Sequence, residues 1–144
     1  MRIHLSTRPC ICANYRKDIP YAIENQILEA LIKAHQRGVK VRIILDRNVS
    51  RAPGADPDEL EERSIRAAAY LKKNKVPVFF DDHQTLTHCK LIIFDGNTVI
   101  LGSANWTFSG LKKNNEAGVL IRDKDTAETY GDMIDGIKLE KARK

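Results

Sequence analysis

Apolar positions recur at helical spacing in the first third of the chain and predict an amphipathic helix over Tyr21–Arg37. The apolar positions are Ile23, Ile27, Leu28, Leu31, Ile32 and Ala34. Gly38 follows this run and is typical of a helix C-cap, so the helix is expected to end there. The next segment, Val39–Asp46, is rich in β-branched residues and predicts a sheet strand.

The rest of the chain alternates in the same way between apolar and polar segments. Residues 47–57 contain prolines and a glycine and predict a surface loop, and the acidic turn beginning at Asp58 predicts a helix that continues to about Lys73. A tight turn at Asp95-Gly96-Asn97 joins two of the expected strands. The further strands are expected at Arg2–Cys12, Val76–Phe80, Cys89–Phe94, Thr98–Leu101 and Ala117–Ile121, and a polar, amphipathic helix begins near Asp125 or Thr126.

Strands that alternate with helices early in the chain, and a hairpin that comes late, predict an α/β fold with a mixed β-sheet flanked by helices. The chain has 144 residues, of which 42% are apolar and 30% charged, and this balance is typical of one compact domain with its own core. No repeat or composition shift divides it. Residues 1–144 are therefore expected to form a single domain.

The net charge of +5 favours an anionic partner, either nucleic acid or an anionic membrane surface, although a solvated Lys/Arg surface explains it equally well. No stretch approaches the roughly 20 apolar residues that a membrane-spanning helix needs. The first residues do not resemble a signal peptide, which favours a cytoplasmic location for the chain as given, whereas a missing N-terminal segment would leave a periplasmic or membrane-attached location open. The three cysteines, Cys10, Cys12 and Cys89, suggest no disulfide framework.

A histidine and a lysine stand together at the start of an apolar strand. His88 and Lys90 are two positions apart, so in a strand they share one face while Cys89 points to the other. The following residues Leu91–Phe94 are all apolar, which is typical of a strand buried on both faces. A lysine ammonium beside a histidine that titrates near neutral pH predicts an anion site capable of nucleophilic or acid–base chemistry.

Two further polar segments add groups suited to phosphate chemistry. Gly102, Ser103 and Asn105 follow the strand after the tight turn and offer hydrogen-bond donors to a phosphate oxygen. Glu116 precedes the next strand and could accept a hydrogen bond from an imidazole. Trp106 and Phe108 fit packing in the core or in a dimer interface better than stacking on a base or lipid.

A metal site is the competing interpretation of the same region. The candidate ligands are Asp81, Asp82, His83, His88 and Cys89. The expected strand alternation separates Cys89 from His88, which counts against this cluster.

The residues His88-x-Lys90-(x)4-Asp95, followed by Gly102-Ser103-x-Asn105, resemble the HxK(x)4D signature of the phospholipase D superfamily with its downstream Gly-Ser-x-Asn element. The likeness extends over about residues 20–122, and it is greatest to small, single-motif bacterial nucleases of the Nuc type and to mitochondrial cardiolipin hydrolase-like relatives. The resemblance implies that His88 attacks phosphorus to form a phosphohistidine. It implies that Lys90, Asn105 and Ser103 line the phosphate pocket, that Glu116 orients an imidazole, and that Asp95 is mainly structural.

The superfamily's mechanism needs two histidines, one to attack and one to protonate the leaving oxygen, and it needs no metal or other cofactor. This chain has one HxK motif, because no lysine stands two residues after His4, His35 or His83. The resemblance therefore implies a homodimer in which two copies of His88 share one site.

The expected function is a metal-independent nuclease acting on DNA or RNA. Two alternatives are open: a phospholipase D-type hydrolase of anionic phospholipid such as cardiolipin, and a weakly active nucleic-acid-binding module of a larger system. Small superfamily members usually begin with an additional strand and helix that Arg2–Asn14 does not supply. Truncation, an alternative start and natural shortening all account for that difference.

Overall fold

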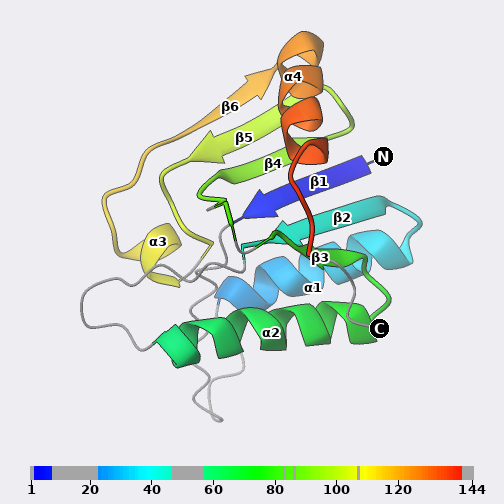
Figure 1. The fold of residues 1–144 in the computed structure, drawn as a ribbon. Helices are drawn as coiled ribbons and strands as arrows, with labels where there is room; N and C mark the ends of the chain where they lie inside the picture. Colours follow the sequence, from blue (N-terminus) through cyan, green and yellow to red (C-terminus); the bar gives the residue numbers. More distant parts are fainter. Residues whose placement is uncertain are drawn as a thin grey trace.

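A computed structural model describes residues 2–7, 23–46, 57–82, 84–85, 87–106 and 108–140 of the chain (Figure 1). The predicted α/β class is confirmed: four helices and six strands are present in this part of the chain. In chain order they are β1 (Arg2–Thr7), α1 (Ile23–Gln36), β2 (Lys40–Leu45), α2 (Pro57–Lys73), β3 (Val78–Phe80), β4 (Lys90–Phe94), β5 (Thr98–Gly102), α3 (Phe108–Lys112), β6 (Gly118–Arg122) and α4 (Lys124–Asp135).

The strands form one mixed sheet in the order β3-β2-β1-β4-β5-β6. β1, β2 and β3 are parallel to one another, whereas β4 runs antiparallel to β1, and β5 and β6 continue antiparallel. The parallel pairs are those joined through helices, and the antiparallel β4–β5 pair is joined by a short turn, as each connection requires. The predicted mixed sheet is therefore confirmed.

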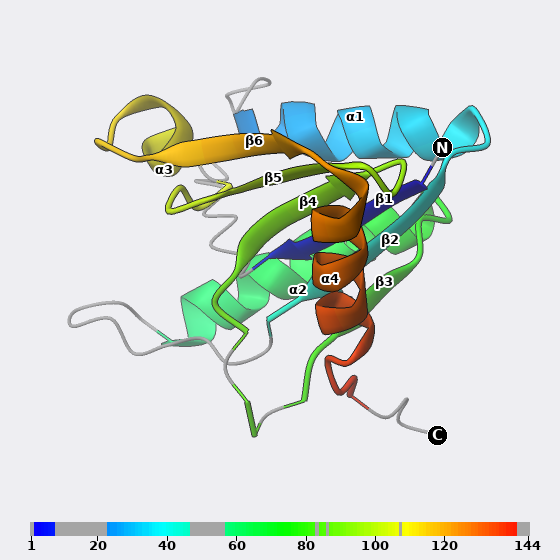
Figure 2. The ribbon, with the colours of Figure 1, turned by 90° about the horizontal axis from the view of Figure 1, so that it is seen from above.

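Helices cover both faces of the sheet (Figures 1 and 2). α1 and α2 pack on one face, where Leu28, Leu71 and Ile43 belong to one buried apolar cluster. α4 crosses the other face, where Ile134 packs with Ile44 and Leu91. Successive β2 residues alternate between these two clusters because a strand projects its side chains to opposite faces.

The helix boundaries follow local signals that the sequence carries. α1 is followed by Gly38 at φ +86°, and the Gly38 N–H donates to the carbonyl of His35 at 2.9 Å. A residue with a Cβ adopts that backbone conformation at a cost, so the glycine ends the helix as expected. α4 begins after Asp123, whose carboxylate accepts the Thr126 N–H at 2.7 Å as an N-cap.

Most ends of the predicted helices and strands lie within one or two residues of the observed ones. One observed helix was missed. β4 begins at Lys90 instead of Cys89, and β3 begins at Val78 instead of Val76. The part of the first predicted strand that follows Thr7, and most of the predicted loop at 47–57, lie outside the described residues. The short helix α3 (Phe108–Lys112) was not predicted.

The tight turn between β4 and β5 has the conformation that its sequence predicts. Asp95 and Gly96 both have positive φ, at 54° and 66°, and the Asn97 N–H donates to the Phe94 carbonyl at 3.1 Å. Two positive φ values in succession are the geometry of a type I′ turn, for which Asp-Gly is a preferred pair.

Candidate active site

The sheet brings the candidate residues together at one edge. Thr7, the last residue of β1, lies opposite Lys90, the first residue of β4. At the same edge Gly102 ends β5 opposite Gly118, which begins β6. His88 precedes β4, Ser103 follows β5 and Glu116 precedes β6, so three connections of separate strands meet beside α3 (Figure 1).

Lys90 is a buried cation at this edge, where the carboxylates of Asp46 and Asp81 are buried as well. It is 6% exposed, and its ammonium donates to the backbone carbonyl of His88 at 3.1 Å. His88 itself is exposed. The lysine thus provides a positive charge held at the backbone of His88, because a buried ammonium that donates a hydrogen bond has little freedom to move.

Ser103 and Glu116 are joined by a direct hydrogen bond across the β5–β6 end. The Ser103 hydroxyl donates to Glu116 Oε2 at 2.5 Å and accepts the Ala117 N–H at 3.1 Å. The Ser103 N–H in turn donates to the Ala117 carbonyl at 2.9 Å. Because a hydroxyl has one proton, Ser103 holds Glu116 in place in this structure and does not present a donor to the pocket.

Glu116 is held in its charged form. Its carboxylate accepts from Ser103 and, through Oε1, from Asn114 Nδ2 at 3.0 Å. These two hydrogen bonds, together with the positive charge of Lys90, lower the pKa of Glu116 below its ordinary value. An anionic carboxylate beside a phosphate pocket suits a protonated imidazole better than it suits phosphate itself.

Asn105 carries an unsatisfied polar atom at the same edge. Its Oδ1 is buried and has no hydrogen-bond partner within the described residues, and neither has Nε1 of Trp106. A buried polar atom without a partner costs free energy. Because Oδ1 is an acceptor, only the Nδ2 amide of Asn105 is chemically suited to a phosphate oxygen. Trp106 packs against the cluster of α1 and α2, which confirms its expected place in the core.

Asp95 lies at the other end of β4. The five residues of the strand place it roughly 16 Å from the His88 end, at about 3.3 Å per residue. The structure therefore brings together His88, Lys90, Ser103, Asn105 and Glu116, and separates Asp95 from them. The location suits the structural role that was expected for Asp95.

The competing metal cluster gains no support from the described residues. They contain no group of three or more histidine, cysteine or acidic side chains gathered closely enough to hold an ion, and His83 lies outside them. Cys89 forms no disulfide within the described residues and packs with the cluster beneath α4. Cys10 and Cys12 lie outside the described residues. No helix among the described segments is long and apolar enough to span a membrane.

Two residues of the site were not singled out from the sequence. Asn114 holds Glu116, and Gly110 in α3 packs against the backbone of Asn105. A glycine inside a helical segment lowers helix stability and so often has a packing reason, which is the one local signal that Gly110 offers. The sequence gives Asn114 only as part of the segment Asn114-Asn115-Glu116, which resembles the Asn-x-Glu-like segment after the superfamily motif, and it assigns this residue no role.

The fold and this site together define an α/β domain in which a histidine and a buried lysine lie at one sheet edge. The chain matches the family described as cardiolipin synthase, PLD-like domain, over residues 13–137. Among curated relatives, a phospholipase D from Rickettsia prowazekii is 38% identical over 107 residues, which are 74% of this chain and 47% of the relative. A mitochondrial cardiolipin hydrolase from Xenopus laevis is 34% identical over 97 residues, 67% of this chain and 40% of the relative.

Solved structures agree with these sequence matches. The phospholipase D family member Nuc from Salmonella typhimurium has a TM-score of 0.72 and 25% identity, and the match covers 100% of this chain and 83% of that one. NucT from Helicobacter pylori has a TM-score of 0.66 at 19% identity, covers 94% of this chain and 77% of that one, and shows the fold alone.

The chain belongs to the phospholipase D superfamily, whose members are phosphodiesterases and related hydrolases. It spans about half the length of the curated relatives that it matches.

Proposed function

We propose that this domain hydrolyses phosphodiesters without a metal, acting as a nuclease through a phosphohistidine intermediate at a site shared by two copies of the chain. The observation that carries the proposal is the meeting of His88, Lys90 and the hydrogen-bonded Ser103–Glu116 pair at one sheet edge. An accessible imidazole beside a fixed ammonium provides a nucleophile and a charge to stabilise the developing phosphorane.

In the first step, a nitrogen of the His88 imidazole attacks phosphorus and the bond from phosphorus to the leaving oxygen breaks. That oxygen takes a proton from the imidazolium of the partner subunit's His88. In the second step, the imidazole of the partner subunit's His88, now neutral, removes a proton from water. The water oxygen attacks phosphorus, and the P–N bond to the first His88 breaks. The products are a phosphomonoester and an alcohol, and each imidazole returns to its starting protonation state.

The remaining residues bind and orient in this mechanism. Lys90 and the Asn105 amide nitrogen hold non-bridging phosphate oxygens. Glu116, kept anionic by Ser103 and Asn114, stabilises an imidazolium and fixes which nitrogen carries the proton. A second copy supplies the second imidazole in this proposal, because the chain has one HxK motif and His35 lies in the last turn of α1, next to the start of β2 at the opposite sheet edge.

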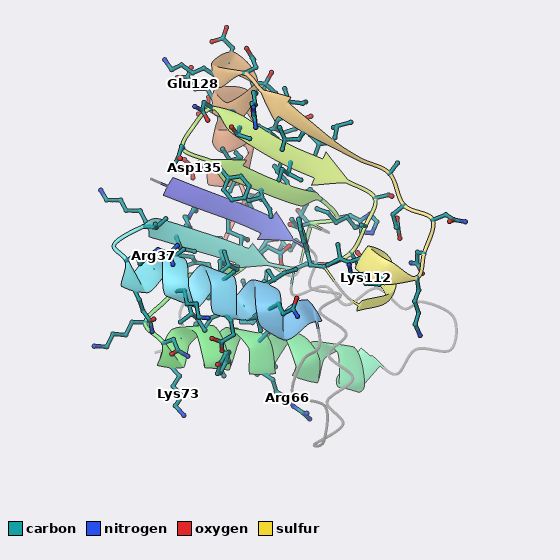
Figure 3. All side chains as sticks on the ribbon, turned by 180° about the vertical axis from the view of Figure 1, so that it is seen from behind. Arg37, Arg66, Lys73, Lys112, Glu128 and Asp135 are labelled. Atoms are coloured by element: carbon teal, nitrogen blue, oxygen red, sulfur yellow. The ribbon has the colours of Figure 1, made fainter. Side chains whose placement is uncertain are left out.

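Nucleic acid is the proposed substrate because the net charge of +5 favours a polyanion. The basic residues include Lys112, which projects from α3 beside the site edge (Figure 3). The second candidate is an anionic phospholipid, and the specific observation in its favour is that curated relatives are named phospholipase D and mitochondrial cardiolipin hydrolase.

An assay with excess chelator separates the two. Single- and double-stranded DNA, RNA and cardiolipin-containing vesicles are each incubated with the protein, with His88→Ala and with His35→Ala as the matched control. We expect nucleic acid to be cleaved by the protein and by His35→Ala, and not by His88→Ala. Turnover of lipid alone would contradict the nuclease, and activity lost in chelator would contradict the metal-free reaction.

A further inference from the structure

Gly110 lies in α3 against the backbone of Asn105. A Cβ at position 110 would stand 2.3 Å from the Asn105 carbonyl oxygen and 3.0 Å from its backbone nitrogen. Both distances are shorter than, or at the limit of, what a carbon atom tolerates beside backbone, and neither neighbour is a flexible side-chain end. The contact therefore fixes where the Asn105 backbone lies relative to α3.

The glycine is not required by its own backbone conformation. Its φ is not among the positive values of the described residues, which occur at Gly38, Lys75, Asp95 and Gly96. Gly131 in α4 is a useful comparison, because a Cβ there would meet nothing within 4 Å. The lack of room for a Cβ beside Asn105 thus distinguishes Gly110 from Gly131, where a Cβ is expected to be tolerated.

We infer that Gly110 is a positioning residue for the reaction: it allows α3 to hold the Asn105 carboxamide at the phosphate pocket. The inference rests on the proposed role of Asn105 as a ligand of phosphate oxygen. The Asn105 side chain is half-buried with an unpartnered Oδ1, so its position is set by its backbone and not by hydrogen bonds of that oxygen. A Cβ at position 110 would move that backbone, and displacements of about 1 Å in a reacting site can lower a rate by about 100-fold.

A double-mutant cycle between Gly110→Ala and Asn105→Ala tests the inference. The readouts are kcat, KM, and the affinity for orthovanadate, which imitates the phosphoryl group. We expect Gly110→Ala alone to weaken vanadate binding and to lower kcat by about 10- to 100-fold. In the Asn105→Ala background the same substitution should have almost no further effect, because the group that it displaces is already absent.

A merely structural role would give a different pattern. Losses from Gly110→Ala that multiply with those from Asn105→Ala would overturn the inference, and so would unchanged vanadate affinity in folded Gly110→Ala protein. Gly131→Ala is the matched control, expected to keep the activity and vanadate affinity of the unaltered chain. If Asn105→Ala itself leaves vanadate affinity unchanged, the proposed role of Asn105 fails, and the inference fails with it for that separate reason.

Gly110→Ala could also prevent folding, and Leu111→Ala covers that case. Leu111 is half-buried in α3, so its truncation loosens the helix without adding an atom beside Asn105. We expect weaker vanadate binding that again disappears in the Asn105→Ala background. Unchanged vanadate affinity in Leu111→Ala would show that the position of α3 does not matter to Asn105, and would contradict the inference.

Discussion

The Ser103 hydroxyl donates a hydrogen bond to Glu116 Oε2 across the end of the β5–β6 pair. Its loss in Ser103→Ala removes the larger of the two hydrogen bonds that lower the pKa of Glu116. The Glu116 pKa is then expected to rise toward its ordinary value, so activity that needs the carboxylate is lost at a higher pH as the solution is acidified. At neutral pH we expect roughly a 10-fold loss, the usual effect of one hydrogen bond to a charged group.

The measurement is the pH profile of kcat/KM, whose acidic limb should move to higher pH in Ser103→Ala. Thr129→Ala, which removes a hydroxyl that bonds the Asp125 carbonyl within α4, is the matched control and should leave the profile unchanged. An acidic limb that stays in place in Ser103→Ala would show that Glu116 does not govern it.

Lys90 should separate activity from stability. Lys90→Met removes a 6% exposed ammonium and keeps a side chain of similar length. We expect kcat/KM to fall by about 100- to 1000-fold, the loss typical of an electrostatic group at a reacting centre. The thermal midpoint of unfolding should stay unchanged or rise, because burying a charged group at an active site often lowers the stability of the fold and Lys90→Met removes that charge.

Thermal unfolding and steady-state kinetics of the same samples check this expectation. Lys73→Met is the control, since Lys73 is an exposed lysine in the last turn of α2. A large fall in the Lys90→Met midpoint would mean that the ammonium supports the fold, and the loss of activity could then not be assigned to the reaction.

Elements that are determined by neighbouring residues in the sequence could be predicted, whereas those that depend on contacts with distant residues could not. Apolar periodicity and a C-capping glycine are local, so both ends of α1 and β2, and the start of α4, are predicted to within two residues. α3 has five residues around a glycine and depends on its contact with Asn105, so the sequence gives little sign of it. The spaced motif identified His88, Lys90 and Asn105. That Glu116 accepts from Ser103 and Asn114 follows from the β5–β6 register, in which Gly102 faces Gly118, and no local pattern encodes it.

The α4 cap gives a pH-dependent stability test away from the site. The Asp123 pKa is lowered, mainly by its hydrogen bonds with Thr126. A lowered pKa in the folded state adds stability above the unfolded pKa, and this stability is lost as the pH falls through the folded value. Asp123→Ala should therefore lower the thermal midpoint by a few degrees at neutral pH, and by less once the pH is below that folded value.

Thermal midpoints measured from neutral to acid pH give this comparison, with Asp132→Ala as the control. Asp132 is an exposed acid in the same helix and accepts through its backbone carbonyl, so its truncation should not lower the midpoint. A destabilisation by Asp123→Ala that is equally large at all pH values would contradict the charged cap.

Subunit exchange tests the shared site. Unaltered chain and His88→Ala are mixed in equal amounts under conditions that allow dimers to exchange. If each site needs both histidines, mixed dimers are inactive, and activity should fall to about half that of the same amount of unaltered chain alone. Unchanged activity in a mixture shown to exchange would contradict the shared site, as would a fully active monomer.

Trapping the intermediate tests the central claim most directly. A nuclease substrate carrying a labelled phosphate is mixed with the protein in excess chelator, quenched in alkali and digested for mass spectrometry, with His88→Ala and His35→Ala beside it. We expect the labelled phosphoryl group, still esterified to the retained nucleotide fragment, on the peptide that contains His88, stable in alkali and released by acid, in the unaltered chain and in His35→Ala. Rapid turnover in chelator without any phosphate on His88, or labelling that persists in His88→Ala, would contradict the account.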